Sequence, residues 1–184
     1  PRPTPAPGLP TGDCLIWRHT CRQPAPWQTA PVNSGFLRWI AEELVSLLEK
    51  WPQNLAAGII HGDLFPDNVL GSEGEVTAIL DLEEAWIGPL AFDLVMAYVG
   101  FGWVDGEPSE ECWQALLSGY QSVRSLTEDE WFSLPILHRY ATLSIAAWRY
   151  WKHNMSQPDE EHADRYLEMV ERLDVPLPFM ENRR

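Results

Sequence analysis

The fold is decided by one stretch of sequence, HGDLFPDN at residues 61–68, which continues as VLGSEGEVTAILD at residues 69–81. Two short apolar runs lie on either side of Gly71–Gly74, and this pattern predicts a β-hairpin with a four-residue loop. Asn68 lies directly before the first predicted strand, and Asp81 lies directly after the second. Because antiparallel pairing brings these chain ends together, we expect Asn68 and Asp81 to face one cation.

The residue types in this stretch suit phosphoryl transfer from a nucleotide. Mg²⁺ usually takes one or two oxygen ligands from the protein, and water and phosphate oxygens complete its octahedron. Asn68 and Asp81 can supply those ligands. Asp63, five residues before Asn68, can instead point at a hydroxyl group and accept its proton.

His61-Gly62-Asp63 with Asn68 resembles the catalytic loop of protein-kinase-like enzymes, in the form found in the aminoglycoside phosphotransferase and choline kinase superfamily. HGDLFPDNVL, AILDLEEA, AFDLV and LLSGYQSVRSLTEDE are similar to segments of bacterial type II homoserine kinases. The resemblance runs from Asn33 to about Leu173. It implies an α+β, mainly helical fold: the C-terminal lobe of a protein-kinase-like fold, with a small β-hairpin that carries the metal ligands. It also implies ATP and Mg²⁺ as cofactors.

The resemblance implies a role for each matching residue. Asp63 would be the catalytic base, and Asn68 and Asp81 would bind the metal and the nucleotide. His61 and Asp93 would be structural supports, with Asp93 hydrogen-bonded to the backbone of the catalytic loop. The walls of the substrate pocket would include Glu83, Trp103, Trp148 and Trp151. Two alternatives remain open: Glu83 is solvated, and the three tryptophans pack in the core.

The implied activity is phosphorylation of a small-molecule hydroxyl substrate, either homoserine or a related amino alcohol or aminoglycoside. The sequence shows neither a glycine-rich phosphate loop nor a strand with a phosphate-binding Lys, and nothing before Asn33 resembles the family's N-terminal lobe. We therefore expect that lobe in the full-length protein. The alternative is a truncated lobe or pseudokinase that serves as a non-catalytic binding module. A metal-dependent phosphohydrolase built on His61, Asp63 and Asp67 is a third hypothesis.

The remaining sequence predicts three regions: an irregular Pro-rich segment at 1–32, the kinase-like lobe at 33–176 and a tail at 177–184. The hairpin is expected to be the only strand pair, with Gly88-Pro89 as a turn. Helical periodicity and capping residues predict helices from Asn33 or Ser34 to Pro52, from Ala91 to Val99, from Ser109 to Val123, after the capping box Thr127–Glu130, from Pro135 past Trp148, and from Pro158 to Leu173.

Composition limits the function classes. The 184 residues include 27 acidic and 13 basic side chains, for a net charge of -14, which disfavours binding to nucleic acid or to anionic membranes. No apolar run reaches the ~20 residues of a membrane span. The odd cysteine count, three, favours a reducing, cytoplasmic location. Cys14, His19 and Cys21 lie close together, but no fourth ligand completes a zinc pattern.

Overall fold

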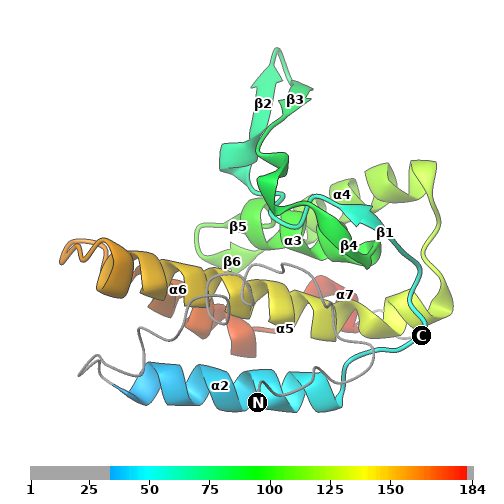
Figure 1. The fold of residues 1–184 in the computed structure, drawn as a ribbon. Helices are drawn as coiled ribbons and strands as arrows, with labels where there is room; N and C mark the ends of the chain where they lie inside the picture. The colour runs from blue at the N-terminus through cyan, green and yellow to red at the C-terminus, as the bar shows by residue number, and fades with distance from the viewer. Residues whose placement is uncertain (1–33, 182–184) are drawn as a thin grey trace.

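The computed structural model describes residues 34–181, which form a helical body from which one β-hairpin projects (Figure 1). The expectation of a mainly helical α+β fold is confirmed for this region. The α-helices are α2 (Ser34–Glu49), α3 (Ala91–Phe101), α4 (Glu110–Val123), α5 (Glu128–Trp151), α6 (Arg165–Glu171) and α7 (Pro178–Glu181). The strands are β1 (Ala57–Ile60), β2 (Val69–Ser72), β3 (Glu75–Ile79), β4 (Trp86–Pro89), β5 (Trp103–Val104) and β6 (Glu107–Pro108).

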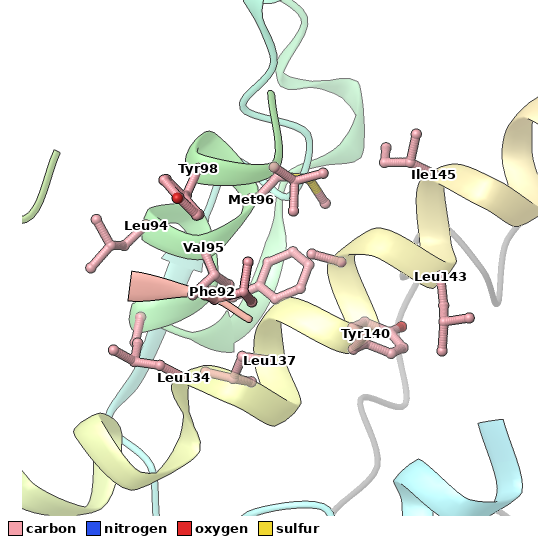
Figure 2. Packing of buried hydrophobic residues seen from close by; sticks show 14 of the residues in the cluster. Phe92, Leu94, Val95, Met96, Tyr98, Leu134, Leu137, Tyr140, Leu143 and Ile145 are labelled. Carbon is pink, nitrogen blue, oxygen red and sulfur yellow. The ribbon is translucent and has the colours of Figure 1, made fainter. Parts of the chain in front are cut away.

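The core lies between α3 and α5, the longest helix (Figure 2). α3 is apolar on nearly every side because α5, α4 and the loop before β2 all pack against it. Val95 and Met96 of α3 and Leu137 of α5 are fully buried. This packing fixes the first turn of α3, which holds Asp93.

The structure contains two small two-stranded sheets that the sequence did not predict. β1 pairs antiparallel with β4, so the prediction of a turn at Gly88-Pro89 is wrong, as is that of a single strand pair. Pro89 lies at the end of β4 and Gly88 is buried between Ile60 and Trp86, where a Cβ atom would approach their side chains to 2.7 Å. β5 and β6 form a second, very short hairpin.

The predicted hairpin is present as β2 and β3, with Val69 opposite Ile79. Its loop has two residues, Glu73 and Gly74, whose φ angles are 53° and 82°. Positive φ at both positions is the geometry of a type I′ turn, which matches the twist of the strands. The expected four-residue loop is therefore wrong, because Ser72 and Glu75 continue the strand pairing.

Three more helix boundaries were tested by the structure. The caps at Ser109 and Thr127 are confirmed, and Thr127 forms a full capping box with Glu130. The helix predicted to begin at Pro135 is instead part of a continuous α5, because burial on both sides of this proline outweighs one lost backbone hydrogen bond.

The helix predicted from Pro158 to Leu173 is also wrong. A π-helix, Lys152–Ser156, extends α5, and a turn region then precedes the short α6. A 3₁₀ turn follows α6, at Arg172–Asp174. The Asp159 carboxylate accepts a hydrogen bond from the backbone N–H of Glu161, and this local bond competes with helix formation.

The expected boundary at residue 176 falls before two buried side chains, Leu177 and Phe179, so the packed unit continues into α7. Across residues 34–181, no helix is both long enough and apolar enough to cross a bilayer. The predictions for residues 1–32, including those for Cys14, His19 and Cys21, lie outside the described residues.

Candidate active site

The loop at residues 61–68 is tied to α3 by one carboxylate. Asp93 accepts hydrogen bonds from the backbone N–H groups of His61, at 2.7 Å, and of Gly62, at 2.9 Å. Each oxygen of the carboxylate takes one bond, so the loop is held in position and orientation. Gly62 has a φ of 83°, and a Cβ atom there would lie 2.9 Å from the backbone oxygen of Glu84.

His61 ties the same loop to the end of β3. Its Nε2 lies 2.7 Å from the carbonyl oxygen of Leu80, and its Nδ1 lies 3.2 Å from the backbone N–H of Asp63. A carbonyl oxygen only accepts and a backbone N–H only donates, so both contacts fit a neutral ring that carries its proton on Nε2. His61 is 7% exposed, which suits a supporting position behind the loop.

Asp63 and Asn68 contact each other directly. The Asn68 side-chain nitrogen donates to the backbone oxygen of Asp63 at 2.8 Å and to its carboxylate at 3.1 Å. The nitrogen faces Asp63, so the amide oxygen of Asn68 is the atom left to face a cation. Burial raises the pKa of Asp63 above its ordinary value, against the lowering effect of the Asn68 hydrogen bond.

Asp81 reaches the same end of the hairpin. The backbone N–H of Leu80 donates to the carbonyl oxygen of Asn68 at 2.8 Å, which fixes the separation of the two chain ends. Asp81 has a left-handed backbone, with φ 58° and ψ 61°, a conformation that aspartate tolerates better than most residues. The strand pairing thus places Asp81 beside Asn68.

These side chains line one wall of a cavity of about 340 Å³. The acidic wall holds Asp63, Asp67, Asn68, Asp81 and Glu84. The rest of the lining, called the cationic wall, comes from α5, the π-helix and α6: Ile145, Trp148, Arg149, Lys152, His153 and Arg165. The cavity is therefore lined both by carboxylates from the loop and hairpin ends and by cationic groups from the helices.

The cationic wall is partly fixed by contacts of its own. The Lys152 ammonium lies 4.5 Å from the centroid of the Trp148 ring, a cation–π distance. Arg149 donates to Glu168 at 2.7 Å and to the backbone oxygen of Arg165 at 3.1 Å. Arg149 is therefore held in an ion pair, and Lys152 and Arg165 are the other two Lys or Arg side chains of the lining.

The structure brings together four of the predicted site residues and separates three. Asp63, Asn68, Asp81 and Trp148 line the cavity, while His61 and Asp93 support it from behind. The side chains predicted to contact substrate but absent from the cavity lining are Glu83, Trp103 and Trp151.

Trp103 lies where the core-packing alternative places it. Its ring packs against the core and lies 4.4 Å from the guanidinium of Arg172. Glu83 is exposed in the turn after Asp81, whereas its neighbour Glu84 lines the cavity. The sequence reasoning missed the cationic wall, although three basic residues between Arg149 and Arg165 are conspicuous in a chain with so few.

Comparison with known proteins gives the family. The sequence model of the phosphotransferase enzyme family (APH) matches residues 2–126, more than half of the chain. The chain belongs to this family. The match begins at residue 2, so the expectation that residues before Asn33 lie outside the family resemblance is wrong. Residues 2–32 show no periodic pattern by which the family resemblance could be recognised from this sequence alone.

The curated relatives of this APH chain include several homoserine kinases. It is 37% identical to the homoserine kinase of Rhizobium meliloti over 128 residues, which cover 69% of this chain and 39% of the relative. It is 40% identical to that of Sinorhizobium medicae over 113 residues, 61% of this chain and 35% of the relative. It is 39% identical to that of Xanthobacter autotrophicus over 120 residues, 65% of this chain and 37% of the relative. The chain thus spans under half of the length of these relatives.

Proposed function

We propose that this chain carries the catalytic centre of an ATP-dependent kinase that phosphorylates the hydroxyl group of homoserine or of a related amino alcohol. One observation carries the proposal: Asp63, Asn68 and Asp81 line a single cavity in a chain of a phosphotransferase family. A small-molecule kinase needs a proton acceptor and oxygen ligands for a metal within one site.

Asp63 accepts the proton of the acceptor hydroxyl and orients its oxygen toward the phosphoryl group. Its raised pKa suits this role, because a carboxylate of higher pKa is a stronger base. The hydrogen bond from Asn68 holds the carboxylate in one orientation. His61 and Asp93 fix the backbone on which Asp63 is carried.

The donor set fits Mg²⁺, since Asn68 and Asp81 offer the amide and carboxylate oxygens that this hard cation prefers. Bound there with the nucleotide, Mg²⁺ would offset negative charge on the transferred phosphoryl group. Asp67 and Glu84 add negative charge to the same wall and favour a dication over a free anion.

The cationic wall favours an acceptor with a carboxylate. The chain has only 13 basic residues against 27 acidic ones, yet Arg149, Lys152 and Arg165 all line this cavity. An amino acid such as homoserine presents a carboxylate to these groups and its hydroxyl to Asp63. A polycationic aminoglycoside would meet like charges on this wall, which disfavours that acceptor class.

A second lobe is part of this proposal. Leu70, Val76 and Ile79 of the projecting hairpin are between 49% and 67% exposed, an unusual number of large apolar side chains for so small an element. The chain also spans under half of its relatives. We expect a further lobe, in the full-length protein, to cover this hairpin and to complete the nucleotide site.

The test is phosphorus NMR of the full-length protein with ATP, Mg²⁺ and either homoserine or homoserinol, in which a hydroxymethyl group replaces the carboxylate. The proposal expects a phosphate ester from homoserine and a higher KM for homoserinol. Lys152→Gln or Arg165→Gln should raise the KM for homoserine by about tenfold or more, the loss of one charge-assisted hydrogen bond. Lys50→Gln, a change of equal charge outside the cavity, should leave it unchanged.

The outcomes separate the alternatives. Absence of any phosphorylated product with homoserine, homoserinol or an aminoglycoside would favour the non-catalytic binding module. Hydrolysis of a phosphate ester without nucleotide would favour the phosphohydrolase hypothesis instead. Efficient phosphorylation of an aminoglycoside would contradict the role assigned to the cationic wall.

A further inference from the structure

Three side chains, one of which lines the cavity, form a cluster that the proposed kinase chemistry does not use. They are His153 in the π-helix and Asp159 and His162 in the turn before α6. One ligand atom from each lies within 4.8 Å of the others. Nδ1 of His162 is 2.6 Å from the Asp159 carboxylate, and the two imidazole rings stack with centroids 5.3 Å apart.

Backbone hydrogen bonds hold this cluster together independently of its side chains. The N–H of Asp159 donates to the carbonyl oxygen of His153 at 2.9 Å, and the N–H of His162 donates to that of Asp159 at 3.2 Å. The side chain of Asn154 donates to the carbonyl oxygen of Ala163 at 2.9 Å. Since the chain is already folded around the cluster, a ligand that binds there does not have to order a loose loop.

The ligand set indicates the class of ion. Two imidazole nitrogens and one carboxylate suit Zn²⁺, Ni²⁺, Co²⁺ or Cu²⁺, whereas Mg²⁺ and Ca²⁺ prefer oxygen. Zn²⁺ binds nitrogen and oxygen at about 2.0–2.2 Å, so its ligand atoms lie about 3.3 Å apart in a tetrahedron. The three ligand atoms now lie within 4.8 Å of one another, so small side-chain rotations would bring them to that spacing.

The charges around the cluster act in both directions. Lys152 and Arg165 lie near His153 and oppose a dication electrostatically, while the Asp159 carboxylate within the cluster attracts one.

We propose that His153, Asp159 and His162 form a binding site for one zinc-class dication, separate from the Mg²⁺ site proposed at Asn68 and Asp81. The bound ion would join the π-helix to the turn before α6. Because His153 also lines the cavity, occupancy would fix the position of the cationic wall. Three protein ligands leave at least one coordination position for water.

The test is calorimetric titration of the full-length protein with Zn²⁺, in the presence of saturating Mg²⁺, combined with the visible spectrum of the Co²⁺ form. Asp159→Asn and His162→Gln each remove one ligand. Glu160→Gln is the matched control, since it removes the same charge as Asp159→Asn from the adjacent, exposed residue. Circular dichroism checks that each variant folds.

We expect the wild type to bind one more equivalent of Zn²⁺ than His162→Gln does. Asp159→Asn should raise the Kd for this additional Zn²⁺ more than about tenfold. Glu160→Gln should change that Kd less than twofold. The Co²⁺ spectrum should lack the intense thiolate band that ligation by Cys14 or Cys21 would give. Equal stoichiometry in the wild type and His162→Gln, or equal losses in Asp159→Asn and Glu160→Gln, would overturn the site.

Discussion

Asp93 gives the sharpest test of how the fold positions the catalytic loop. In Asp93→Asn, the amide oxygen can accept from only one of the two backbone N–H groups that the carboxylate holds. The new NH₂ group faces the other N–H, and two donors cannot bond. His61 and Gly62 are buried, so the N–H group that loses its acceptor cannot form a hydrogen bond with water instead.

The magnitude follows from these contacts. A hydrogen bond to a charged group contributes about 1.5–3 kcal/mol, and a buried unsatisfied donor costs about 1–3 kcal/mol. We expect Asp93→Asn to lower the free energy of unfolding by about 2–4 kcal/mol. For a chain of this size, that loss corresponds to a drop in Tm of about 5–15 °C.

Urea denaturation followed by tryptophan fluorescence measures this loss, and Asp105→Asn is its control. Asp105 is exposed in the β5–β6 turn with φ 51°, a conformation that asparagine tolerates equally well. Its variant should lie within about 0.5 kcal/mol of the wild type. If Asp93→Asn were equally harmless, the carboxylate would not brace the loop and the reasoning would be refuted.

Two further predictions concern backbone strain and pH. Gly62→Ala should destabilise more than Gly74→Ala, by about 1–3 kcal/mol in urea denaturation. Both glycines have φ above 80°, but only at Gly62 would the new Cβ meet the backbone oxygen of Glu84; equal losses would contradict this. Burial, with a smaller effect of Arg172, lowers the pKa of His138 to about 3. As the pH is lowered through 6.5, the unfolded chain binds a proton at His138 that the folded chain does not bind. The free energy of unfolding therefore decreases as the pH is lowered from 6.5 to about 3. The slope from His138 reaches about 1.4 kcal/mol per pH unit, and His138→Gln should remove it; an unchanged slope would contradict the buried neutral ring.

Much of the acidic wall could be predicted from sequence because it depends on local structure. Asn68 and Asp81 flank one hairpin, so antiparallel pairing of its strands brings them together, and Asp63 follows from its distance to Asn68 along one short loop. The loop length was wrong by two residues, yet the pairing at the open end of the hairpin did not depend on it.

The cationic wall could not be predicted in the same way. Lys152 and Arg165 meet the cavity only because α5 extends as a π-helix and the chain then returns through α6, and neither feature has a periodic signal. For Trp103 the sequence left both a pocket wall and core packing open, and the ring packs against the core and against Arg172.

Some of the missed structure did have a local signal. Asp105-Gly106 is the residue pair typical of a type I′ hairpin turn, and both residues have positive φ in the structure. Pairing of β1 with β4 had no such signal, since 25 residues separate the two strands and Pro89 argues against a strand.

The central claim is that Asp63 acts as the base of a phosphotransferase centre, and Asp63→Asn tests it most directly. The measurement is turnover of ATP with homoserine by the full-length protein, with nucleotide affinity determined in parallel and Asp105→Asn as the control of equal charge. We expect Asp63→Asn to lower kcat by about 10²–10⁴ and to leave the Kd for ATP nearly unchanged. Turnover by Asp63→Asn equal to that of Asp105→Asn would show that Asp63 is not the base.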